Sequence, residues 1–133
     1  MPEIVKGFMQ RQTNELVKGK ITMPQFFILN VLGKEGATKM TDIAHVLNVT
    51  TAAATGIIDR LVKYGYVERL YEPQDRRIIK VKLTKTGTQL LTRINQQKKQ
   101  MIMDIFGRIS QAERESYLKI LTRIQDILTE PRA

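Results

Sequence analysis

A short segment of the chain, residues 50–63, carries small side chains, hydroxyls and cations on one side of a predicted helix. Small side chains let a helix approach base edges in the major groove of DNA, and an alanine methyl can contact a thymine methyl. Threonine hydroxyls can donate hydrogen bonds to phosphates or bases, and arginine can reach a phosphate or a guanine. The residues predicted to contact DNA from this segment are Thr50, Ala52, Thr55, Gly56, Arg60 and Lys63. Taken alone, the same segment is also typical of a solvated helix rich in good helix formers, so its interpretation depends on what surrounds it.

A polar loop at residues 72–77 contains an aspartate followed by a pair of arginines, Asp75, Arg76 and Arg77. At the tip of a β-hairpin, an arginine can enter the minor groove, where narrow A·T tracts concentrate negative potential. An aspartate at such a tip would face phosphates, which is unfavourable unless it binds a cation. We therefore expect the Asp75 carboxylate to accept hydrogen bonds from Arg77 or another nearby arginine and to hold it pointing into the groove. The ordinary alternative is a set of solvated loop charges.

The elements that position these residues are predicted from periodicity and capping signals. Thr41 is expected to cap a short helix over residues 42–47, and Thr50 a longer one that ends near Gly65. Thr38, Lys39 and Thr41, close to a helix start, are expected to contact phosphates through side chains and free N–H groups. Alternating apolar and cationic residues then predict a β-hairpin. The sequence thus predicts a helix-turn-helix at 41–64 and a wing at 66–83, within a winged core at 38–84.

The rest of the chain is predicted to be helical. Apolar positions at helical spacing occur over residues 3–18, and Thr22-x-x-Gln25 and Ser110-x-x-Glu113 have the form of capping boxes. The fold class is mainly α with a small β-hairpin (α+β). A chain of 133 residues with a small winged core cannot easily bury all the terminal apolar stripes within itself. Residues 1–20 and 86–130 are therefore expected to be dimerisation helices of a homodimer.

The composition is strongly basic. Lysine and arginine number 22 against 13 acidic residues, for a formal net charge of +9. Such an excess suits a polyanionic partner, either nucleic acid or an anionic membrane surface. No apolar run is long enough to predict a membrane span, and the order of the elements favours double-stranded DNA over a membrane.

Several kinds of chemistry find no support in the sequence. Cysteine is absent, which, with the lack of a signal-peptide pattern, favours a cytoplasmic protein. The single histidine, His45, lies on the polar side of a short predicted helix and is interpreted as solvated. The chain contains no nucleophile motif, no phosphate-binding glycine loop and no paired-carboxylate arrangement. We therefore expect no catalytic residues, no metal site and no cofactor.

Four sequence motifs occur in a characteristic order: D-R-L at residues 59–61, G-Y-V-x-R at 65–69, D-R-R at 75–77 and L-T-x-x-G at 83–87. Together with residues 40–44, this combination resembles the signature of the MarR family of bacterial winged helix-turn-helix transcriptional regulators. The match covers about residues 20–90 in detail, and the flanking helices match in position and pattern only.

The resemblance implies a single MarR-like domain over residues 1–133. It implies a homodimer whose first and last helices intertwine, and a pseudo-palindromic operator near a promoter, bound by a protein acting as a repressor. The family's D-x-R pattern corresponds to Asp75 and Arg77. Relatives often accept a small aromatic effector between the dimer helices and the winged domain. Oxidation sensing and metal sensing do not transfer, because this chain has no cysteine and one histidine.

Two other functions remain open from the sequence. A winged helix can serve as a protein–protein adaptor, although an adaptor has no need for paired arginines at the wing tip. The chain could also bind RNA or DNA without sequence preference. The scarcity of aromatic residues, with four tyrosines, four phenylalanines and no tryptophan, disfavours single-strand binding.

Overall fold

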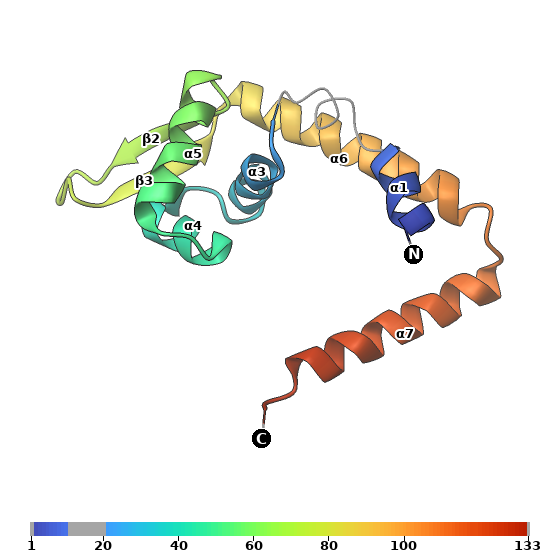
Figure 1. Ribbon diagram of the computed structural model, residues 1–133. Coiled ribbons are helices and arrows are strands. Elements are labelled where there is room, and N and C mark those ends of the chain that lie inside the picture. Colours follow the sequence, from blue (N-terminus) through green and yellow to red (C-terminus); the bar gives the residue numbers. More distant parts are fainter. Residues whose placement is uncertain (1, 11–20, 133) are drawn as a thin grey trace. The chain divides into compact units, whose positions relative to one another are not determined.

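The computed structural model describes residues 2–10 and 21–132 (Figure 1). The chain divides into two compact units, residues 1–97 and residues 98–133, and each is described by itself. The elements are α1 (Pro2–Gln10), α3 (Met23–Glu35), β1 (Thr38–Lys39), α4 (Met40–Leu47), α5 (Thr51–Lys63), β2 (Val67–Tyr71), β3 (Ile79–Leu83), α6 (Lys85–Phe106) and α7 (Gln111–Thr129). The predicted fold class, mainly helical with a small antiparallel sheet, is confirmed.

The helix α3 begins at the predicted capping box. The Thr22 hydroxyl accepts a hydrogen bond from the Gln25 backbone N–H at 3.3 Å, and the Gln25 side chain accepts one from the Thr22 N–H at 2.9 Å. Two of the N–H groups that have no partner within the helix are thereby satisfied. At its other end Gly36 is the C-cap, and Gly33 lies inside the helix.

The first helix of the helix-turn-helix, α4, starts earlier than predicted. Thr41 was expected to be its N-cap, but the N-cap is Lys39, which makes no side-chain capping bond, and the helix begins at Met40. The reason is packing: Met40 is only 6% exposed, and a cap at Thr41 would keep it in extended backbone outside the helix. The second helix, α5, follows the prediction, with the Thr50 hydroxyl accepting from the Ala53 N–H at 3.1 Å.

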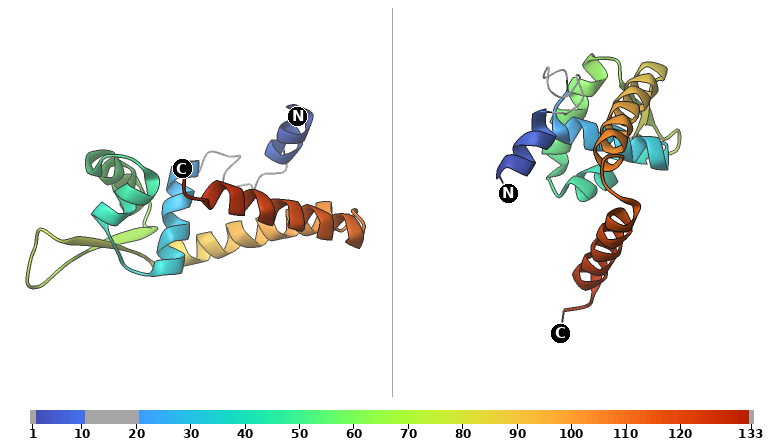
Figure 2. Two further views of the ribbon diagram at one scale, coloured as in Figure 1. Left: turned by 90° about the horizontal axis from the view of Figure 1, so that it is seen from below. Right: turned by 90° about the vertical axis from the view of Figure 1, so that its right-hand side faces the viewer.

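A three-stranded antiparallel sheet with strand order β1-β3-β2 combines β1, which precedes α4, with the two strands that follow α5. The strands β2 and β3 confirm the predicted hairpin, with Val67 opposite Leu83 and Tyr71 opposite Ile79. Gly65, with φ +80°, makes the turn from α5 into β2. The loop joining the hairpin projects beyond α4 and α5 (Figure 2). The third strand, β1, was not predicted, because a strand of two residues has no period to detect.

The hydrophobic core of residues 1–97 joins α3, the helix-turn-helix, the hairpin and the first half of α6. Its fully buried side chains include Phe26, Ile28, Leu29, Ile43, Ile58, Leu61, Val67, Val81, Leu90 and Ile94. Thr84 connects the hairpin to α6: its hydroxyl donates to the Gly65 carbonyl and accepts from the Gly87 N–H. The start of α6 is therefore attached to the turn that ends α5.

Residues 98–133 contain the second half of α6 and the helix α7. The predicted capping box at Ser110 and Glu113 is present, and the rings of Phe106 and Tyr117 lie 5.7 Å apart. No residue of α7 is buried. The second half of the predicted first helix, residues 11–20, lies outside the described residues. Among the described helices, none is long and apolar enough to cross a membrane.

Candidate nucleic-acid interface

The predicted recognition face of α5 lies on the solvent side of the helix. The opposite side packs into the core through Ala54, Ile58 and Leu61. Ala52 and Gly56 are exposed, and a Cβ added at Gly56 would meet no atom within 4 Å. The face predicted from the sequence also includes Thr50, Arg60 and Lys63, which are exposed, and Thr55, which is half-buried. The part of this face with the smallest side chains, at Ala52 and Gly56, is therefore open to a binding partner.

The threonines of this face differ in the hydrogen bonds that they make. The Thr50 hydroxyl accepts the capping bond, so its proton is free to donate to a partner. The hydroxyl of Thr55, which is half-buried, donates to the Thr51 carbonyl at 2.8 Å. A new donor bond from Thr55 therefore requires that this internal bond be exchanged.

An ion pair between the recognition helix and the wing was missed by the sequence analysis. Asp59, exposed on α5, accepts a hydrogen bond from the guanidinium of Arg69 on β2, whose side chain is only 21% exposed. The Arg69 guanidinium offsets the negative charge of Asp59, which would otherwise face an anionic partner. The pair also connects α5 to the hairpin. The D-R-L motif begins with an acidic residue and the G-Y-V-x-R motif ends with a basic one, and this was the signal in the sequence. The two residues become neighbours only when β2 folds beside α5.

The expected contact at the wing tip is present. The Asp75 carboxylate accepts three hydrogen bonds from Arg77, one from the backbone N–H, one from Nε and one from Nη2, each at 3.0 Å. The side-chain bonds of Arg77, and then its backbone bond, hold the pKa of the Asp75 carboxyl below its usual value. In return the carboxylate raises the pKa of the Arg77 guanidinium. Arg77 nevertheless stays 91% exposed, so the pair fixes its direction without hiding it.

The cations of the hairpin strands are also paired with carboxylates. Lys80 lies 2.9 Å from Glu72, and Lys82 lies 3.1 Å from Glu68. In contrast, four of the five cations in the predicted site make no ion pair with any described residue. These unpaired cations are Lys39, Arg60, Lys63 and Arg76.

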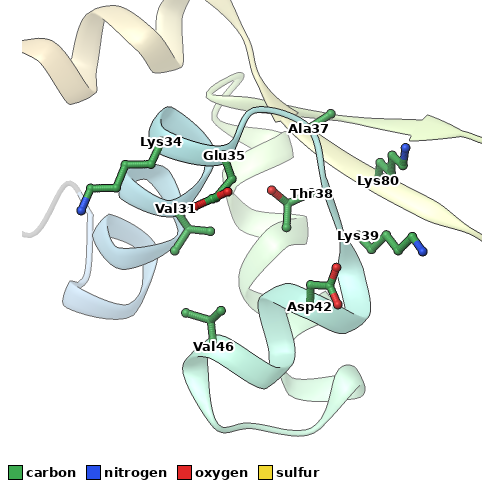
Figure 3. Close-up of a pocket in the computed structure, with 9 residues that line it drawn as sticks. All are labelled: Val31, Lys34, Glu35, Ala37, Thr38, Lys39, Asp42, Val46 and Lys80. Carbon is green, nitrogen blue, oxygen red and sulfur yellow. The ribbon is translucent and has the colours of Figure 1, made fainter. Parts of the chain in front are cut away.

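The remaining predicted contacts lie where β1 runs into α4, beside a groove of about 590 Å³ (Figure 3). Thr38 and Lys39 form β1, and Thr41 is exposed in the first turn of α4. Lys39 is the cross-strand neighbour of Lys80, and both side chains point away from the interior of the groove. The Thr38 hydroxyl donates to the Gly36 carbonyl at 2.9 Å. Thr41 thus lies at the start of α4, as predicted, although it is not the N-cap.

In the described part of the chain, no metal-binding group of side chains accompanies these residues. The described residues hold no group of three or more His, Cys, Asp or Glu side chains that could bind a metal ion. His45 is exposed on α4. Apart from the Asp75 carboxylate, which binds Arg77, the site consists of hydrogen-bond donors, small side chains and cations, and these are the groups that bind an anionic surface.

The chain is similar to known proteins in sequence and in fold. A family model described as the MarR family matches residues 21–79. The HTH-type transcriptional regulator FarR of Neisseria gonorrhoeae is 30% identical over 116 residues, spanning 85% of this chain and 80% of FarR. The crystal structure of YusO from Bacillus subtilis shows the same fold, with a TM-score of 0.83 at 22% identity, over 94% of this chain and 89% of YusO.

A further solved structure contains nucleic acid. Streptococcus pneumoniae FabT, crystallised in complex with DNA, matches with a TM-score of 0.75 at 25% identity, over 94% of this chain and 85% of FabT. The relatives are transcriptional regulators and not enzymes. The protein therefore belongs to the MarR family and is a DNA-binding transcriptional regulator.

Proposed function

We propose that the protein binds a pseudo-palindromic operator sequence-specifically, as a homodimer of a single MarR-like domain. In this proposal α5 lies in the major groove and Arg77 enters the adjacent minor groove. Occupation of an operator next to a promoter would exclude the polymerase, so the protein would act as a repressor. A small aromatic effector would relieve repression, as the family resemblance implies.

The observation that carries this proposal is the face of α5. The small residues Ala52 and Gly56 keep the centre of this face free of long side chains. Around it lie Thr50, Arg60 and Lys63, which can donate hydrogen bonds. A helix needs this combination because base edges lie deep in the major groove and phosphates line its rim. A protein–protein adaptor, the alternative function, does not require a helix face of small side chains surrounded by unpaired cations.

The apolar face of α7 supports the homodimer. Along this helix the side chains of Ile120, Leu121, Ile124 and Ile127 are 43–57% exposed. They recur at helical spacing, which makes a continuous apolar stripe along α7. A second copy offers the same stripe and would bury it. A two-fold dimer would in turn present two copies of α5 to two half-sites.

The proposal is tested by selecting bound sites from random duplexes and sequencing them. We expect a two-fold symmetric consensus, because each subunit would read one half-site. The matched variants are Gly56→Leu and Gly56→Ala, which both add side-chain atoms where the structure has open space. Gly56→Leu should abolish selection of the consensus by holding α5 away from the bases, whereas Gly56→Ala should retain it. Recovery of random sequences by the wild-type protein, or unchanged selection by Gly56→Leu, contradicts the proposal.

A further inference from the structure

We infer that Thr84 is a positioning residue: it fixes the angle between the recognition helix α5 and the helix α6, and so sets the spacing of the two half-sites that the dimer accepts. The inference rests on the proposed function and deepens it, because it concerns the distance between the half-sites and not the bases within them. Thr84 lies between β3 and α6, outside the face of α5 and the wing loop, so it acts without touching DNA.

Three hydrogen bonds of Thr84 meet at the junction where the hairpin ends and α6 begins. Its hydroxyl donates to the Gly65 carbonyl at 2.5 Å and accepts from the Gly87 N–H at 3.1 Å. Its backbone N–H donates to the Tyr66 carbonyl at 3.1 Å. Gly65 and Tyr66 form the turn that follows α5. One side chain therefore binds both the end of the recognition helix and the first turn of α6.

Close contacts surround this junction. A Cβ added at Gly87 would lie 1.9 Å from the Tyr66 carbonyl oxygen, so the backbones of α6 and of the turn are in direct contact. About one turn further along α6, Leu91 packs tightly against α3: a Cβ added at Gly33 would lie 2.6 Å from the Leu91 Cδ2 atom. The start of α6 is therefore held against both the turn after α5 and the helix α3.

A small rotation at the junction has a large effect at the DNA. The helix α5 has 13 residues. At a rise of 1.5 Å per residue it is about 20 Å long. Its C-terminal end lies at the junction, whereas the N-terminal residues of a recognition helix are the ones that contact base edges. A rotation of about 10° therefore moves the start of α5 by about 3.4 Å, the rise of one base pair. Such a rotation moves Gly65 relative to Gly87, and the Thr84 hydroxyl resists it because it binds both.

The angle at this junction matters because α6 leads to the dimer contact. The chain passes from residues 1–97 to the apolar stripe of α7 through α6. In the proposed dimer each copy of α5 occupies one half-site, and the centres of two half-sites lie about 34–36 Å apart or a multiple of that distance. A firm junction lets both copies bind at one spacing only, whereas a loose junction accepts neighbouring spacings at similar affinity.

The experiment compares Thr84→Val, which removes the hydroxyl, with Thr84→Ser, which keeps it. Binding of the full-length proteins is measured by anisotropy on the selected operator, on operators with one base pair inserted or deleted between the half-sites, and on a single half-site. The spacing ratio is the affinity for the selected spacing divided by the affinity for an altered spacing. For Thr84→Val we expect a spacing ratio lower by about tenfold, equivalent to about 1.4 kcal/mol or one to two hydrogen bonds. Thr84→Ser should keep the wild-type spacing ratio, and both variants should bind the single half-site as the wild type does.

The matched control is Thr22→Val, which removes the N-cap hydroxyl of α3 and leaves the junction intact. It lowers stability by loss of a cap without loosening α6, so its spacing ratio should equal that of the wild type. Thermal unfolding checks that each variant is folded. Thr84→Ala, which removes the same hydroxyl with less bulk, replaces Thr84→Val if that variant does not fold.

A wild-type spacing ratio without the Thr84 hydroxyl overturns the inference. An equal loss of the spacing ratio in Thr84→Ser or in Thr22→Val also overturns it, because the hydroxyl at the junction would then not be the cause. These results differ from a failure of the proposed function, in which the wild-type protein itself would show no operator preference.

Discussion

At the scale of single residues, the wing tip shows how an acidic group can serve in a basic interface. Asp75 lies among phosphates in the proposed complex, and its charge alone would weaken binding. Its hydrogen bonds to the backbone and side chain of Arg77 make it a positioning residue for that arginine. A bidentate pair of this kind fixes the plane as well as the direction of a guanidinium.

The substitution Asp75→Asn tests this positioning role. We expect lower affinity for the selected operator, because Arg77 loses its fixed direction, and unchanged or slightly higher affinity for random DNA, because a negative charge is removed. The slope of log K against log salt on random DNA should become steeper, since the charge of Arg77 is then uncompensated. Anisotropy at one fixed salt concentration measures both affinities, and a salt series on random DNA gives the slope. Tighter binding to the operator as well as to random DNA would mean that Asp75 is only a solvated loop charge.

At the scale of elements, the interface depends on how the recognition helix is attached to its neighbours. The ion pair between Asp59 and Arg69 connects α5 to β2. The Thr84 hydroxyl connects the end of α5 to the start of α6. The face of α5 and the wing therefore keep their relative positions within residues 1–97, as reading two adjacent grooves requires.

The close approach of α6 to the turn after α5 predicts the effect of Gly87→Ala. An added Cβ would lie 1.9 Å from the Tyr66 carbonyl oxygen, so the backbone must shift. We expect a loss of about 1–3 kcal/mol or more in the free energy of unfolding. The matched control is Gly56→Ala, where open space and better helix propensity should give a gain of roughly 0.5–1 kcal/mol. Urea denaturation of both variants provides the measurement. Equal effects from the two substitutions would show that the Gly87–Tyr66 contact is not tight in solution.

At the scale of the whole molecule, the apolar face of α7 predicts a dimer. Sedimentation at micromolar concentration should give about twice the 15.3 kDa of one chain. Ile124→Glu places a charge in the stripe, and we expect it to give monomers with greatly reduced operator affinity, because two half-sites can no longer be engaged together. Thr122→Glu adds the same charge to the same helix outside the stripe and should leave the dimer intact. A wild-type monomer, or full operator affinity in an Ile124→Glu monomer, would contradict the dimer model of binding.

Local signals in the sequence predicted most of the elements and the members of the candidate site. The capping boxes at Thr22 and Ser110 mark helix starts because each is satisfied within one turn. The alternation around Val81 predicts a strand because one face of the hairpin is buried. The contact between Asp75 and Arg77 could be expected for the same reason: its partners are two residues apart, so the loop alone brings them together.

Only the tertiary structure decided the features that join distant parts of the chain. Asp59 and Arg69 became partners because β2 packs beside α5. The helix α4 begins at Met40, before the good capping residue Thr41, because burial of an apolar side chain outweighs one capping hydrogen bond. A local pattern determines a structure when its contacts lie within a few residues. A long-range contact depends on the packing of the whole core, which no single segment of the sequence encodes.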